Sequence, residues 1–78
     1  MALVRFFAAA KSITKTSEVE LSGENVAEVL EAAKKEFPEL VTVLTKCSIL
    51  LNEISCTDHN APVGPVDVID VLPPFAGG

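Results

Sequence analysis

The sequence has few positive charges. Six Lys and Arg residues stand against eleven Asp and Glu residues, which gives a formal net charge of -5. The basic residues are scattered along the chain, and only Lys34 and Lys35 are adjacent. Binding of nucleic acid phosphates needs clustered Lys and Arg side chains, so we expect no nucleic acid partner. An acidic balance of this kind suits a basic protein partner instead.

Cysteine and histidine are also scarce. The chain has Cys47, Cys56 and His59, without a CxxC pair or a His/Cys cluster, so we expect no metal site. The two cysteines could be redox or sulfur-relay thiols, but Cys47 stands in phase with Ile49 and Leu51, which favours a packed thiol. Cys56, near a loop, is interpreted as structural too. His59 lacks a Cys or carboxylate partner at a useful spacing, and we expect it in a solvated loop.

Long apolar runs are missing as well. The segment MALVRFFAAAK at the N-terminus is interrupted by Arg5 and has no charged residues in front of it, which argues against a signal peptide. No stretch approaches the roughly 18 apolar residues of a membrane helix. We therefore expect no membrane partner and a cytoplasmic protein whose thiols stay reduced.

The chain does have 78 residues, of which 49% are apolar, and this suffices for one folded domain. Two β-prone segments, 2–9 and 17–21, predict a hairpin with a loop at 10–16. Side chains alternate between the two faces of a strand. In the first segment this period gives an inner face of Val4, Phe6 and Ala8, and an open face of Leu3, Arg5 and Phe7.

An amphipathic helix is predicted after the hairpin. Asn25 is expected to cap it, and Glu28 three residues later completes a capping box. Apolar residues then recur at spacings of three and four and form a single stripe: Val26, Val29, Leu30, Ala33 and Phe37. Pro38 disfavours helical geometry at the residue before it, so we expect the helix to end or kink there.

The rest of the chain predicts a sheet. The remaining elements are a helical turn at 39–45, strands at 47–52, 53–56 and 66–72, and a loop at 57–65. This order favours an α+β fold of the β-grasp type, a mixed sheet of four to five strands with one main helix on one face. We expect the domain to span residues 1–72 and an extended tail to span residues 73–78.

The tail carries the chemistry. It ends in Gly77 and Gly78, and we expect the last glycine to present a free α-carboxylate that can be activated as an acyl-adenylate. Without side chains, the two glycines can enter a narrow channel in another protein and leave the terminal carbonyl unhindered. Pro73 and Pro74 stiffen the base of the tail against the flexibility of glycine.

The ending LPPFAGG, the segment FFAAAK and the element order resemble the MoaD/ThiS family of ubiquitin-like sulfur carriers over essentially the whole chain. The Pro-Pro-x-x-Gly-Gly ending is similar to the MoaD branch, and the segments TKCSILLN and IDVLPPFAGG are similar to its actinobacterial members. Two departures stand out. Phe75 occupies a position where many members have Val, and the turn Asn52-Glu53 lacks the glycine often found there.

The resemblance implies a subunit that is not an enzyme on its own. An adenylyltransferase related to ubiquitin-activating enzymes would use ATP to adenylate Gly78, and a sulfurtransferase donor would convert the adenylate into a thiocarboxylate. The charged carrier would dock on the large subunit of molybdopterin synthase and deliver sulfur to cyclic pyranopterin monophosphate. No tightly bound cofactor is expected on the chain itself.

A docking surface is predicted beside the tail. Alternation brings side chains of three strands together on the open face, and a bare apolar patch usually marks a partner. Scattered surface apolar residues are the alternative interpretation. The expected partner-binding residues are Phe7, Leu50, Leu72, Pro73, Pro74 and Phe75.

Other functions stay open at this point. The chain could serve as a sulfur carrier in thiazole or cysteine formation, or as a protein modifier that forms isopeptide bonds through Gly78. It could also be an interaction module with an inert tail. Asp67 and Asp70 lie on opposite faces of one predicted strand and cannot form a carboxylate pair, so the residues favour a carrier over an enzyme.

Overall fold

The computed structural model describes residues 1–74, and in this part of the chain five strands form one mixed sheet. The strands are β1 (Ala2–Phe6), β2 (Glu18–Leu21), β3 (Ser48–Leu51), β4 (Ile54–Ser55) and β5 (Val68–Leu72). Their order across the sheet is β2-β1-β5-β3-β4. The two central strands, β1 and β5, run parallel, and every other pair is antiparallel.

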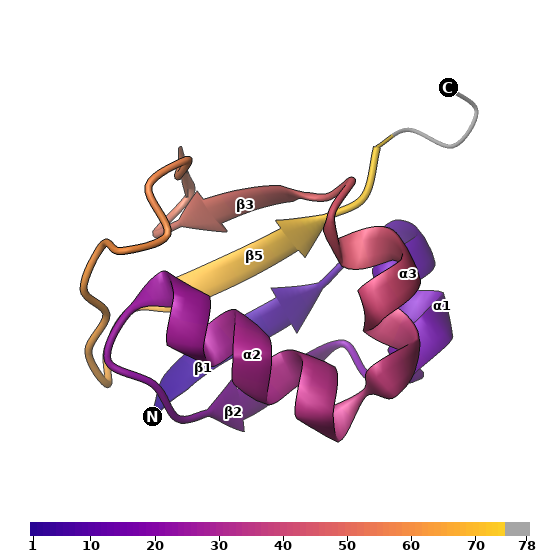
Figure 1. The fold of residues 1–78 in the computed structure, drawn as a ribbon, viewed down its shortest axis with the longest axis horizontal. Helices are drawn as coiled ribbons and strands as arrows, with labels where there is room; N and C mark the ends of the chain where they lie inside the picture. The colour runs from indigo at the N-terminus through magenta and orange to yellow at the C-terminus, as the bar shows by residue number, and fades with distance from the viewer. Residues whose placement is uncertain (75–78) are drawn as a thin grey trace.

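Helices lie between the strands in the chain. They are α1 (Ala8–Thr14), α2 (Val26–Glu36), the short 3-10 helix η1 (Pro38–Leu40) and α3 (Val41–Leu44). Figure 1 shows α2 lying across one face of the sheet, with α1 and α3 together at one end. This arrangement is an α+β fold of the β-grasp type, which confirms the predicted fold class.

The core lies between α2 and the sheet. The predicted helix stripe is buried at Val26, Val29, Leu30 and Ala33, while Phe37 is partly buried and packs against the core. Phe37 meets the ring of Phe6 edge-on, with 5.5 Å between the ring centroids. The sheet side of the core consists of alternate residues of the strands: Ala2, Val4, Phe6, Ile49, Ile69 and Val71.

The start of α2 follows the predicted capping box with one change. Asn25 is the N-cap, and its side-chain oxygen accepts a hydrogen bond of 2.8 Å from the backbone N–H of Glu28. The Glu28 carboxylate accepts a bond of 2.8 Å from the N–H of Glu24, one residue before the N-cap. The helix ends at Glu36, immediately before Phe37 and Pro38, as predicted.

The prediction for residues 2–16 is wrong in part. The first strand ends at Phe6 rather than at residue 9, and the expected loop at 10–16 is largely the helix α1. Alanine has the highest helix propensity, and three alanines open this helix. Ala10 is buried, and α1 packs against η1, so tertiary contacts stabilise a helix that is too short to be stable alone.

The other predicted boundaries differ by one or two residues. The strands expected at 47–52, 53–56 and 66–72 are shorter in the structure, and the helical turn expected at 39–45 appears as η1 and α3. Within residues 1–74, none of the helices has the length and apolar content needed to cross a bilayer.

Candidate functional site

The tail and its base are the first part of the predicted site. Phe75, Gly77 and Gly78 lie outside the described residues. Pro73 and Pro74 are described, and they follow directly on the end of β5, where Pro73 is partly buried and Pro74 is exposed. Because β5 is flanked by β1 and β3, the base of the tail is fixed by a central strand rather than by a loop.

The second part is the open face, defined here as the side chains on the side of the sheet that faces away from α2. The parallel register pairs Phe6 with Val71, so the next positions, Phe7 and Leu72, are level with each other. Leu50 is opposite Asp70 on the neighbouring strand, which makes it a diagonal neighbour of Leu72. Phe7 is 37% exposed, and the two leucines are partly buried. The structure therefore brings the three predicted docking residues onto one face.

An ion pair at the centre of the open face was not predicted. The guanidinium of Arg5 donates two hydrogen bonds to the carboxylate of Asp70, one from Nε at 2.6 Å and one from Nη2 at 2.8 Å. The Asp70 side chain is only 5% exposed, and that of Arg5 is 34% exposed. A buried carboxylate is stable here because a two-point contact with arginine compensates for its lost hydration.

The same guanidinium touches the apolar part of the face. The Arg5 Cζ atom lies 5.7 Å from the centroid of the Phe7 ring, within the range of a cation–π contact. The hydrogen bond and the attraction of Asp70 raise the pKa of Arg5 above its ordinary value, so its charge is permanent. Sequence reasoning placed Arg5 on the open face but compared Asp70 only with Asp67. The available signal was that Arg5 and Asp70 occupy open-face positions of neighbouring strands.

One end of the open face has a small hollow. It has a volume of about 280 Å³ and is lined by Arg5, Asn52, Glu53 and Val68. Asn52 and Glu53 form the turn between β3 and β4, with φ angles of 52° and 70°. Asparagine tolerates this left-handed region at the first position, whereas the second position favours glycine, so the backbone strain of the turn falls on Glu53.

Asn52 fixes this turn to the rest of the sheet. Its backbone N–H donates to the carbonyl of Val68 at 2.8 Å, and its side-chain oxygen accepts from the Val68 N–H at 2.9 Å. Its side-chain amide donates to Asp67 at 3.0 Å. That bond, together with one from the N–H of Gly64, lowers the pKa of Asp67. These contacts hold Glu53 at the rim of the hollow.

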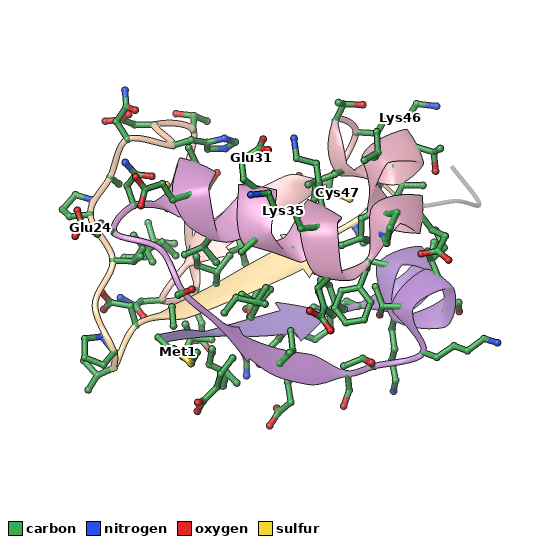
Figure 2. The ribbon with its side chains drawn as sticks, turned by 60° about the horizontal axis from the view of Figure 1, so that its bottom comes forward. Met1, Glu24, Glu31, Lys35, Lys46 and Cys47 are labelled. Carbon is green, nitrogen blue, oxygen red and sulfur yellow. The ribbon has the colours of Figure 1, made fainter. Side chains whose placement is uncertain are left out.

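The cysteines and His59 lie away from the open face. Cys47 is partly buried against the core, and its thiol donates to the carbonyl of Val43 at 3.2 Å. Burial raises the pKa of the Cys47 thiol, which disfavours the reactive thiolate. Cys56 also packs against the core, and His59 is exposed in its loop. In the view of Figure 2, Cys47 is drawn next to Lys35 of α2. Among residues 1–74, no three His, Cys, Asp or Glu side chains are grouped as metal ligands would be.

The fold and the open face define a small ubiquitin-like protein whose last sheet strand leads directly into Pro73 and Pro74. The family model described as "ThiS family" matches residues 4–78. The chain therefore belongs to the ThiS family, whose members are sulfur carriers or ubiquitin-like modifiers.

Solved structures with this fold include a small archaeal modifier protein and a chain of a molybdopterin-converting factor. The small archaeal modifier protein 1 from Methanosarcina acetivorans is 26% identical, with a TM-score of 0.89 over 99% of this chain and 95% of that chain. A chain from the complex of subunits 1 and 2 of the molybdopterin-converting factor of Helicobacter pylori is 32% identical, with a TM-score of 0.75 over 99% and 97%.

A chain from the BexX/CysO complex of Amycolatopsis orientalis is 18% identical, with a TM-score of 0.82 over the full length of both chains, and it shows the fold alone. No curated protein matches the chain. The structures from Helicobacter and Amycolatopsis are both complexes, in which a protein of this fold is bound to a partner protein.

Proposed function

We propose that this chain is the sulfur-carrier small subunit of a molybdopterin synthase. The observation that carries the proposal is that β5 serves two purposes: it contributes Leu72 to the open face and continues directly into Pro73. A partner that grips the open face would therefore hold the base of the tail at a fixed position. The 32% identity to a chain of the molybdopterin-converting factor complex supports this pathway over the others.

In this proposal the tail acts as an acyl carrier. The Gly78 carboxylate attacks the α-phosphate of ATP on an adenylyltransferase and releases pyrophosphate. A sulfurtransferase donor then supplies sulfur at the oxidation level of sulfide, which attacks the Gly78 carbonyl of the acyl-adenylate, displaces AMP and leaves a thiocarboxylate. On the large synthase subunit the thiocarboxylate sulfur passes to cyclic pyranopterin monophosphate, and hydrolysis regenerates the Gly78 carboxylate. Residues of this chain bind the partner and position the tail, and the partners supply the catalytic groups.

A second candidate is a protein modifier. The similarity to the small archaeal modifier protein 1 favours it, and in that case the activated Gly78 carbonyl would form an isopeptide bond with a lysine of a target protein. Both candidates need an adenylated terminal glycine, so the docking face and the tail base would serve either of them. A carrier for thiazole or cysteine formation would use the same steps with another acceptor.

The mass of the protein isolated from its own cells tests these candidates. A carrier gives a population in which one oxygen of Gly78 is replaced by sulfur. A modifier gives a population joined to lysine side chains of other proteins. Sulfur transfer to the pyranopterin by the chain and the large subunit then assigns the pathway, and its absence with a fully thiocarboxylated protein would contradict the molybdopterin proposal.

A tail variant tests the role of Gly78 directly. One residue added after Gly78 moves the carboxylate by about 3.5 Å, which is too far for a positioned reaction. Sulfur transfer should be lost while thermal unfolding stays unchanged. The matched control has the same residue added before Met1, and it should keep full activity. Full activity of a variant shown to retain its C-terminal extension would exclude a carrier role for Gly78.

A further inference from the structure

The hollow at the Asn52-Glu53 turn has an unbalanced charge. Arg5 and Asp70 form a close pair, and their two charges largely cancel toward a partner. The Glu53 carboxylate lies at the rim, 3.8 Å from Nη2 of Arg5, and its side chain is 80% exposed. Because Arg5 already binds Asp70 at two points, Glu53 adds a negative charge that this pair does not balance.

Further negative charges surround the same part of the face. The β1–β2 register places Glu18 opposite Arg5 and Glu20 opposite Leu3. Both glutamates therefore lie on the open-face side of β2, and Glu18 adds to the attraction on Arg5. Counting Arg5, Asp70, Glu18, Glu20 and Glu53, the open face carries one positive and four negative side chains. The field at the hollow therefore attracts a cation and repels a carboxylate.

The geometry points to a specific occupant: the guanidinium or ammonium group of a docking partner's Arg or Lys side chain enters this hollow and binds Glu53. The inference rests on the proposed function, because it assumes that a partner docks on the open face. The hollow and the patch of Phe7, Leu50 and Leu72 share that face, so one partner can contact both. The apolar patch supplies contact area, and Glu53 selects partners that present a positive charge at the correct position.

Binding should depend on the charge of Glu53 and on salt. The experiment uses isothermal titration of the intact chain with the adenylyltransferase and with the large synthase subunit of the same genome. Replacing the charge in Glu53→Lys places a cation against the partner's cation, and we expect the affinity to fall about tenfold or more for the partner that fills the hollow. Glu53→Gln should weaken binding less and should reduce its salt dependence.

Two further variants separate recognition from stability. Glu36→Lys makes the same charge change at an exposed position on α2, which covers the other face of the sheet, and its affinity should stay within about twofold of the wild-type value. Glu53→Gly relieves the left-handed backbone of the turn, so it should raise the melting temperature while it weakens binding. A residue that only supported the fold would not show this opposite pair of effects.

The outcomes distinguish the two levels of inference. If the wild-type chain binds a partner and Glu53→Lys binds it equally well, the hollow has no such occupant, and the docking proposal stands. If Glu53→Lys and Glu36→Lys weaken binding equally, the effect comes from net charge, and the inference is also wrong. If the wild-type chain binds neither partner, the proposed function fails, and this inference fails with it.

Discussion

The two faces of the sheet show how neighbouring residues of one type can have different roles, one in the core and one on the surface. Phe6 and Phe7 are consecutive, yet Phe6 is 1% exposed in the core and Phe7 is 37% exposed on the open face. The inner face is closed by α2 and is built from aliphatic and aromatic side chains. The open face instead has an ion pair at its centre, bordered by apolar residues. Stability resides mainly in the inner face, and recognition is expected on the open face.

The largest effect should come from the inner face. Phe6→Ala removes a fully buried ring and its edge-on contact with Phe37, and we expect a loss of about 3–5 kcal/mol in the free energy of unfolding. A domain of this length has roughly 4–12 kcal/mol in total. Urea unfolding followed by circular dichroism measures the loss, and a change below about 1 kcal/mol would show that the inner face is assigned incorrectly.

Breaking the ion pair should give the next largest effect. It would show that the open face also contributes to the stability of the fold. Arg5→Met leaves the Asp70 carboxylate buried without its partner, which should cost about 2–3 kcal/mol in unfolding free energy. The double variant Arg5→Met/Asp70→Leu replaces both charges by apolar groups and should recover most of that loss. Equal unfolding midpoints for the single and double variants would mean that the unpaired Asp70 carboxylate carries no such penalty.

On the open face, Phe7→Ala should change binding rather than folding. The ring belongs to the predicted docking patch of Phe7, Leu50 and Leu72, and aromatic residues often dominate such contacts, so we expect a loss of about 2 kcal/mol in affinity for the large synthase subunit. Calorimetric titration measures it, and the thermal melt should remain close to that of the wild type. Unchanged affinity with a native melt would place the docking surface elsewhere.

The smallest effect should come from acidification, through Asp67, which is hydrogen-bonded to the turn that carries Glu53. Hydrogen bonds from Asn52 and Gly64 lower the pKa of Asp67 in the folded state. The ionised Asp67 carboxylate therefore stabilises the fold at pH values above its pKa in the unfolded chain, which is about 4. This stabilisation is lost as the pH falls through the lower pKa that Asp67 has in the folded protein. The wild-type melting temperature should therefore drop more steeply below about pH 4 than that of Asp67→Asn. Parallel curves would contradict this assignment.

Much of the fold could be predicted because its signals are local. The period of two in the strands, the stripe of α2 and the cap at Asn25 all depend on residues close in sequence. Helix α1 was missed because its alanines directly follow the β-prone strand β1, and the rest of the helix is polar enough to be interpreted as a loop. It has no side-chain cap, and its burial depends on η1, which follows much later in the chain.

The open face was predicted less completely. Alternation was enough to place Phe7, Leu50 and Leu72 on one side of the sheet. It could not give the register between β1 and β5, and only that register puts Arg5 beside Asp70. The strained conformation of Glu53 was also beyond sequence reasoning, although the missing glycine at this turn was a visible sign of it.

The parallel pairing of β1 and β5 has a consequence for synthesis in the cell. The Arg5–Asp70 contact joins residues 65 positions apart. The pairing of β1 with β5 therefore cannot form until the last strand has left the ribosome. Contacts of such long separation form late, because a long loop must close before they gain any energy. A nascent or truncated chain without β5 lacks both the ion pair and the level Phe7 and Leu72 positions. Partners that recognise this face would therefore accept only chains translated through to the base of the tail.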